Sequence, residues 1–186
     1  MAAALIAVVP GYTSHSIAGL YDNEGIAIFF MLLTCYIWLK AIRTGSLAWS
    51  AACAAAYFAL AASWGGYVFL ANLIPLHVLA LLLTGHFDHR VYIAYSTFYI
   101  LGTVLVMQIP LIGIQPMYSG EHMGSLGVFG LVQVALLTRL GAGLGADDQR
   151  LLRRALLVLS AGIAVAFLVY SVIHGRVAPW TGRYVV

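Results

Sequence analysis

The sequence predicts an all-α protein: a polytopic transmembrane helical bundle with about six complete spans plus the end of an earlier one. Three observations predict it. Of the 186 residues, 63% are hydrophobic, whereas roughly 45–50% is usual in soluble domains. Only 8% are charged, against about 25% in a typical soluble protein. Six apolar stretches also approach the roughly 20 residues that cross a bilayer as a helix. These properties exclude a soluble enzyme, a disordered tail and a disulfide scaffold.

The predicted helices follow one another with short links. Nine apolar residues precede Pro10, and we expect them to be the last turns of an earlier helix, because no positive residue or cleavage site marks a signal peptide. Cys35 and Cys53 lie inside apolar runs and are expected to be small buried hydrophobic residues rather than a disulfide. The six spans are predicted at residues 25–42, 47–63, 67–84, 91–109, 124–140 and 151–174.

The basic residues predict the orientation of the bundle. Seven of the nine Lys and Arg residues follow the first span, lie between the third and fourth, or surround the link between the fifth and sixth. The positive-inside rule places these links in the cytoplasm. The segments expected together on the opposite side are residues 11–24, 63–66, 110–123 and 175–186. The scattered arginines are explained by this topology and by anionic lipid, and they do not indicate a nucleic-acid site.

Two carboxylates one residue apart form the clearest candidate for chemistry. Asp22 and Glu24 precede the first complete span, and in an extended backbone side chains at i and i+2 point the same way. They could share one hard cation, such as Mg²⁺, Mn²⁺ or Ca²⁺. The alternative is that both acids stabilise the positive end of the helix that begins at Gly25.

A resemblance that covers essentially the whole chain favours the first interpretation. The blocks VPGY and YDNEGIAIF, and others in the same order, resemble the catalytic subunits of eukaryotic oligosaccharyltransferase, a family of multi-span glycosyltransferases of the endoplasmic reticulum. The further blocks are residues 40–45 (KAIRTG), 63–69 (SWGGYVF), 72–77 (NLIPLH), 90–99 (RVYIAYSTFY), 107–110 (MQIP), 115–116 (QP), 121–123 (EHM) and 179–183 (PWTGR).

The resemblance implies an activity, substrates and a cofactor. The family transfers an oligosaccharide from dolichyl diphosphate to the Asn of an Asn-x-Ser/Thr acceptor, in a complex with other oligosaccharyltransferase subunits. Asp22-Asn23-Glu24 corresponds to its second acidic motif, whose acids hold Mn²⁺ or Mg²⁺ against the leaving diphosphate. The resemblance also makes the four segments opposite the cytoplasm lumenal, and the charge-based orientation agrees with this independently.

One position departs from the family pattern. The family has Arg seven residues before the Asp of the motif, where this chain has His15. Arg is always charged and presents a planar fork of donors, whereas His is mostly neutral near pH 7 unless a neighbouring acid holds its proton. His15 could therefore keep part of the catalytic role beside Asp22 and Glu24, or mark a weakened site. The alternative is that it is an interfacial histidine without a role in the site.

Other candidates have two interpretations each. Trp64 and Tyr67 flank a Gly-Gly turn and are either an interfacial aromatic belt or a border of the lipid-linked sugar. Glu121-His122 could bind metal or peptide, but a solvated loop is expected. His77 is a polar residue within a span, and such residues are often functional; the expected alternative is a hydrogen bond to backbone groups freed by Pro75.

Residues 1–186 are expected to be the central part of the transmembrane glycosyltransferase domain, without the soluble lumenal C-terminal domain of the family. The family site also uses an acid from the first lumenal loop, a Glu from the last large loop and a Trp-Trp-Asp signature, none of which this sequence contains. We therefore expect an internal fragment that is inactive alone. The alternatives are a non-catalytic membrane scaffold and a small transporter or channel with His77, Gln108 and Gln133 along a polar path.

Overall fold

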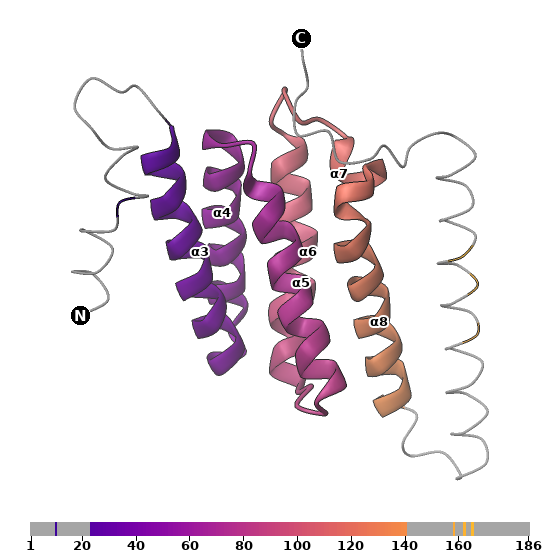
Figure 1. Ribbon diagram of the computed structural model, residues 1–186. Helices are drawn as coiled ribbons and strands as arrows, with labels where there is room; N and C mark the ends of the chain where they lie inside the picture. The colour runs from indigo at the N-terminus through magenta and orange to yellow at the C-terminus, as the bar shows by residue number, and fades with distance from the viewer. Residues whose placement is uncertain (1–9, 11–22, 141–157, 159–161, 163–164, 166–186) are drawn as a thin grey trace.

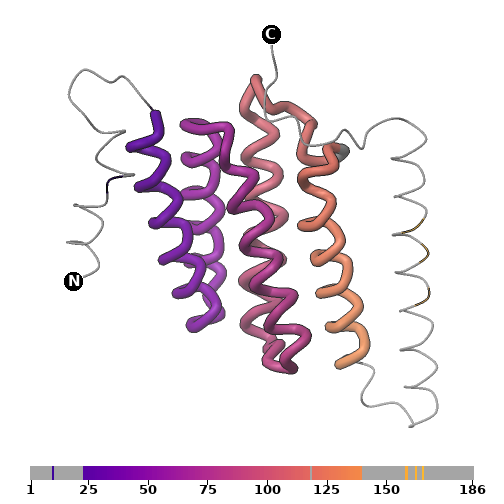
Figure 2. The backbone as a smooth tube through the Cα atoms, in the orientation of Figure 1, coloured from indigo at the N-terminus to yellow at the C-terminus, as the bar shows by residue number. Residues whose placement is uncertain are grey.

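The computed structural model describes residues 10, 23–140, 158, 162 and 165. In this part of the chain the regular structure is helical, with no strand. The long helices run side by side in alternating directions (Figure 1), as the tube in Figure 2 also shows. The helices are α3 (Glu24–Thr44), α4 (Leu47–Ser63), α5 (Tyr67–Leu83), α6 (His89–Met107), α7 (Gln115–Tyr118), the 3-10 turn η1 (Gly120–His122) and α8 (Met123–Leu140).

The five predicted spans that fall in this region are confirmed as helices, with ends within two residues of the prediction. The prediction of six complete spans is wrong for the described residues. Three helices there are long and apolar enough to cross a membrane, at Glu24–Thr44, His89–Met107 and Gly120–Arg139. The sixth predicted span and the expected helix end before Pro10 lie outside the described residues, apart from a few isolated positions.

The two remaining helices are shorter for a local reason. Helices α4 and α5 have 17 residues each, which at about 1.5 Å per residue is roughly 25 Å, less than the ~30 Å hydrocarbon core. The chain leaves α4 at Trp64, whose φ of −152° and ψ of 132° are extended. It leaves α5 at Thr84, and Gly85 then takes a positive φ of 76°.

Gly45 joins α3 to α4 in a two-residue link. Its φ of 65° is left-handed, and its N–H donates to the carbonyl of Ala41, a helix end that glycine adopts without strain. A Cβ at this position would also lie 2.8 Å from Cγ of Arg90, at the start of α6. The link therefore turns α4 back along α3 and leaves room for α6.

Small side chains let α4 pack against both α3 and α6. Cys53 and Ala54 on α4 are fully buried, and such residues allow close approach between helices in a membrane. Cys53 lies 3.6 Å from the carbonyl oxygen of Thr34. Both cysteines are free thiols, with Cys53 buried, as expected of a small core residue, and Cys35 half-buried.

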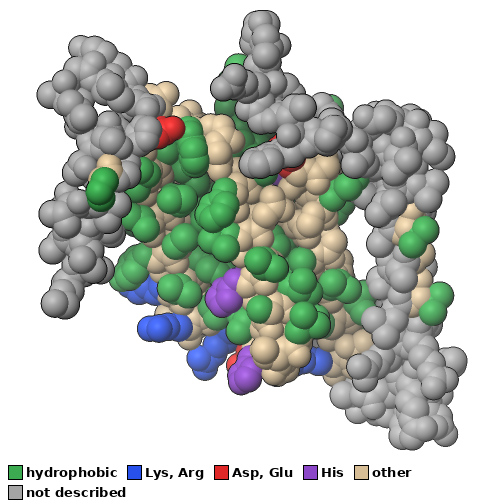
Figure 3. Space-filling view, in the orientation of Figure 1, with side chains coloured by type: hydrophobic (Ala, Val, Ile, Leu, Met, Phe, Trp, Pro, Cys, Tyr) green, Lys and Arg blue, Asp and Glu red, His purple; other side chains and the backbone are tan. Residues whose placement is uncertain are grey.

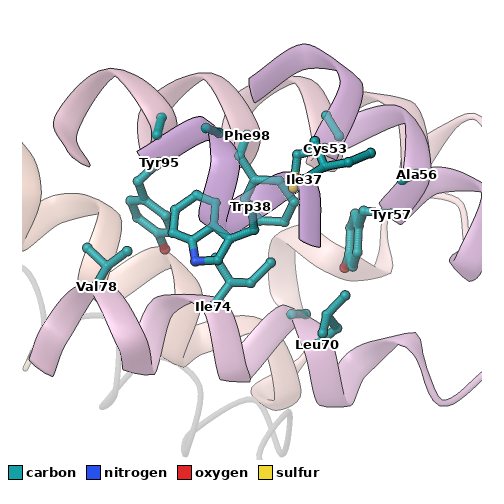
Figure 4. Close-up of a cluster of buried hydrophobic side chains, with 14 of the residues drawn as sticks. Ile37, Trp38, Cys53, Ala56, Tyr57, Leu70, Ile74, Val78, Tyr95 and Phe98 are labelled. Carbon is teal, nitrogen blue, oxygen red and sulfur yellow. The ribbon is translucent and has the colours of Figure 1, made fainter. Parts of the chain in front are cut away.

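The indole of Trp38 joins the helices of the core. Figure 4 shows it among side chains of α5 and α6, with ring centroids 5.7 Å from Phe98 and 6.3 Å from Tyr95. Its Nε1 donates to Nδ1 of His77, 3.1 Å away. The expectation for His77 was wrong: in the described structure its ring accepts from Trp38 on α3 rather than pairing with backbone freed by Pro75.

The basic residues of the described chain gather at one end of the bundle, and two of its three acids, Glu24 and Glu121, lie at the other, while Asp88 lies among the basic residues. The end where α3, α5 and α8 begin carries Glu24 and Glu121 and is called the acidic end. The opposite, basic end carries every Lys and Arg of the described residues, and Figure 3 shows them along the lower edge. Segments 63–66 and 110–123 lie at the acidic end, as the alternation of charges predicted. The four basic residues are Lys40, Arg43, Arg90 and Arg139.

Candidate functional site

The predicted carboxylate pair is only half within the described residues. His15 and Asp22 lie outside them. Glu24 is half-buried and is the first residue of α3, at the acidic end. A carboxylate there lies at the positive end of the helix dipole, which is compatible both with a metal ligand and with simple stabilisation of the helix.

The acids, thiols and imidazoles of the described residues do not complete the predicted metal site. Among the described residues, no three His, Cys, Asp or Glu side chains come together as they would around a metal ion. Glu24 contributes a hard oxygen donor of the kind that Mn²⁺ and Mg²⁺ prefer. The donor chemistry thus fits, and the rest of the ligand set would have to come from Asp22 and from groups beyond the described residues.

Trp64 and Tyr67 lie at the acidic end but differ in exposure. Trp64 is 38% exposed, whereas Tyr67 is 5% exposed. The six-membered ring of Trp64 covers Gly66, so a Cβ at residue 66 would collide with it. The second glycine of the turn, Gly65, has open space where its Cβ would be. Of the two aromatic residues predicted to border the sugar, Trp64 can therefore reach a ligand directly.

Tyr67 belongs to the buried part of the same end. Its ring packs against Tyr57 at 6.0 Å and against His122 at 5.8 Å between centroids. The ring contact with His122 joins the α4–α5 turn to η1. Tyr67 therefore packs the turn that it shares with Trp64 against α4 and η1.

Three hydrogen bonds hold η1 and the start of α8 against the neighbouring helices. Asn72 on α5 donates to the carbonyl of Glu121 at 2.9 Å. Ser125 donates to the carbonyl of Ala71 at 3.0 Å. Tyr95 on α6 donates to the carbonyl of Ser125 at 2.9 Å. Together they place Glu121 at the same end as Glu24 and Trp64.

Sequence reasoning missed Asn72 and Ser125. Both are polar residues in otherwise apolar runs, and Asn72 opens one of the blocks that carry the family resemblance. Intramembrane polar residues commonly pair with one another or with backbone. That rule could have identified the two residues as bridges, but it could not have identified their partners.

The expectation of a solvated loop at Glu121-His122 is wrong for the histidine. His122 is 8% exposed, and its Nδ1 lies 2.7 Å from Oγ of Ser119. Its other nitrogen, Nε2, is buried and has no hydrogen-bond partner in the part of the chain that the structure describes. The physical reason is the ring contact with Tyr67, which draws the turn inward.

The residues suggested for a transport path are dispersed in the described structure. His77 pairs with Trp38. Gln133 on α8 accepts from Tyr92 at 3.0 Å and lies 3.4 Å from Ser96, both on α6. Gln108 donates from Nε2 to the carbonyl of Val104, four residues earlier in the sequence. Each side chain serves a different contact, so the three do not form one polar path.

Comparisons with known proteins identify the family. The sequence-family model described as "Oligosaccharyl transferase STT3, N-terminal" matches residues 1–186. The "Dolichyl-diphosphooligosaccharide--protein glycosyltransferase subunit STT3" of Dictyostelium discoideum is 49% identical over 99% of this chain and 26% of its own length. The corresponding stt3 subunit of Schizosaccharomyces pombe is 46% identical over 99% of the chain and 25% of its own length. The STT3B subunit of Oryza sativa subsp. japonica is 49% identical, again over 99% of the chain and 26% of its own length. The chain thus spans about a quarter of the length of these relatives.

Proposed function

Because the chain belongs to the STT3 family of oligosaccharyl transferases, we propose that it forms part of a membrane glycosyltransferase for protein N-glycosylation. The enzyme would transfer an oligosaccharide from dolichyl diphosphate to the Asn of Asn-x-Ser/Thr acceptors. The observation that carries the proposal is the 45–49% identity to glycosyltransferase subunits over nearly the whole chain. The bundle would lie in the endoplasmic reticulum membrane beside the other subunits of the complex.

The acidic end is proposed to face the lumen. It gathers segments 63–66 and 110–123 with the start of α3, and the opposite end holds the basic residues that the positive-inside rule assigns to the cytoplasm. We place segments 11–24 and 175–186 on the same lumenal side from the charge pattern and the family resemblance. The lipid-linked donor and the acceptor polypeptide would then approach the same end of the bundle.

Asp22 and Glu24 would hold Mn²⁺ or Mg²⁺ at this end. A bound divalent cation supplies Lewis-acid stabilisation of the departing diphosphate. The placement of Glu24 in the first turn of α3 supports the assignment, since the helix fixes the carboxylate while Asp22 precedes the helix on the chain. His15 would contact the same diphosphate as a cation, with its proton held by the two acids.

Trp64 would border the lipid-linked oligosaccharide. Its exposed indole at the acidic end supports this role, because aromatic faces pack well against sugars and lipids at a membrane interface. The buried ring of Tyr67 would hold the Trp64 turn in place. Since the resemblance assigns further acids of the site to other loops, we propose that residues 1–186 alone do not turn over.

Substitution of Asp22 or Glu24 tests whether these two residues bind the metal ion. In a full-length chain, Asp22→Ala and Glu24→Gln are each expected to lower transfer to an acceptor peptide by at least about tenfold, because each removes a charged ligand of the cation. The measurement is the transfer rate at several Mn²⁺ concentrations, with excess metal expected to restore part of the rate.

Asp88 provides the matched control. It is an exposed acid at the start of α6, at the basic end, so Asp88→Asn should leave the transfer rate and its metal dependence unchanged. Equal effects of Asp88→Asn and Glu24→Gln would contradict the metal assignment.

A further inference from the structure

A small, partly open pocket lies between α4, α5, α6 and the beginning of α8. Its volume is about 20 Å³. The lining side chains that matter here are Tyr57, Thr103, His122 and Ser125, which come from four different elements. This cavity is separate from Glu24 and from the exposed face of Trp64.

His122 is one of the residues that line this pocket. It is 8% exposed, and its Nε2 is buried without a hydrogen-bond partner among the described residues. Ser119 occupies only the other ring nitrogen, at 2.7 Å. Buried polar groups in native proteins are nearly always paired, with protein or with ordered water, so Nε2 indicates a missing partner.

We propose that one ordered water molecule occupies the cavity and hydrogen bonds to Nε2 of His122. A cavity needs roughly 10–15 Å³ to hold a water molecule, so the volume of about 20 Å³ accommodates one molecule. A buried water also needs two to four polar partners. Ser125 donates to Ala71 and keeps its lone pairs as acceptors, and Thr103 and Tyr57, whose side chains carry hydroxyl groups, also line the pocket.

Water fits this site better than other ligands. No Asp or Glu lines the cavity, so a cation would find no charge partner there. The Ser119 hydroxyl can either donate to or accept from Nδ1, so Nε2 is a donor in one arrangement and an acceptor in the other. Water can satisfy both arrangements, because it donates and accepts.

The bound water connects the η1 turn to α4 and α6. His122 has no direct hydrogen bond to either of these helices among the contacts of the described residues. The water therefore adds a polar link where Tyr67 already contributes a ring contact. This inference depends on the cavity alone and stands whether or not the proposed glycosyl transfer is correct.

An experimental map of the full-length chain in its complex tests the proposal directly. At a resolution near 2 Å, a peak is expected about 2.7–3.2 Å from Nε2 of His122. An empty cavity in a map that shows other buried waters would overturn the proposal.

A double-mutant cycle in the same complex gives a second test. Thr103→Val and His122→Phe should each lower the melting temperature, and His122→Phe should lower it more than the control Ser119→Ala, which removes only the Nδ1 contact. The double variant His122→Phe with Thr103→Val should show a smaller shift than the sum of the two, because both residues act on one water. Additive shifts, or a His122→Phe variant no less stable than Ser119→Ala, would also overturn it.

Discussion

At the residue scale, the acidic end depends on a few side chains whose surroundings differ sharply. Trp64 is partly exposed while Tyr67, three residues later, is buried. Gly66 is the residue that permits this, because the Trp64 ring occupies the space where its Cβ would lie. The turn thus presents one aromatic ring outward and uses the other as packing.

Gly66→Ala is expected to displace the indole of Trp64. In the full-length enzyme, this should raise KM for the lipid-linked donor several-fold and change kcat less, since the indole is proposed to bind the donor rather than take part in the chemistry. The matched control is Gly65→Ala, which meets no atom within 4 Å. Equal KM values for the two variants would count against a binding role of Trp64.

At the scale of elements, α4 organises the bundle. It packs against both α3 and α6, and its alanine-rich sequence makes both contacts close. Its first link, through left-handed Gly45, reverses the chain in two residues. A leucine-rich helix at the same place would hold its neighbours further apart.

Ala54→Leu tests this packing. Ala54 is fully buried, so three added carbon atoms should overpack the α3–α4–α6 contact and lower the free energy of unfolding by about 1–3 kcal/mol. The neighbouring Ala55 is exposed, and Ala55→Leu should change stability by less than about 0.5 kcal/mol. The comparison requires denaturation of both variants in the same detergent. Similar losses at the two positions would show that α4 is not packed as described.

At the scale of the whole molecule, the bundle is polarised in charge. Every Lys and Arg of the described residues lies at the basic end, while Glu24 and Glu121 lie at the acidic end. This polarity would orient the protein in the membrane with the acidic end on the lumenal side. The proposed transfer requires that orientation, because the donor glycan and the acceptor are proposed to meet at the acidic end, on the lumenal side.

Cysteine labelling in sealed microsomes checks the orientation. Leu111, in the link that follows α6 at the acidic end, is 92% exposed, and His86 is exposed in the link at the basic end. With the native cysteines replaced, His86→Cys should react with a membrane-impermeant maleimide directly. Leu111→Cys should react only after the membrane is permeabilised. The reverse pattern would invert the proposed topology.

Much of the fold could be predicted from the sequence because the bilayer core offers no water to hydrogen bond to the backbone. Long apolar runs must become helices there, since every backbone polar group needs a partner within the segment. Five helices and the separation of charge between two ends were predicted for this reason, and the family was predicted from ordered blocks such as the one around Asp22 and Glu24. Span count was overestimated because the prediction accepted stretches of 17 and 18 residues as complete spans, and the helices at these places, α4 and α5, have only 17 residues each.

Only the tertiary structure decided which polar side chains meet. His77 pairs with Trp38, Asn72 with the carbonyl of Glu121, and His122 turns inward to Tyr67. In each case the partner comes from another helix, far away in the sequence. Hydropathy and charge can be assessed for each segment separately, because they describe how that segment interacts with the solvent. A directional hydrogen bond instead depends on how two helices are rotated and how deep each sits relative to the other.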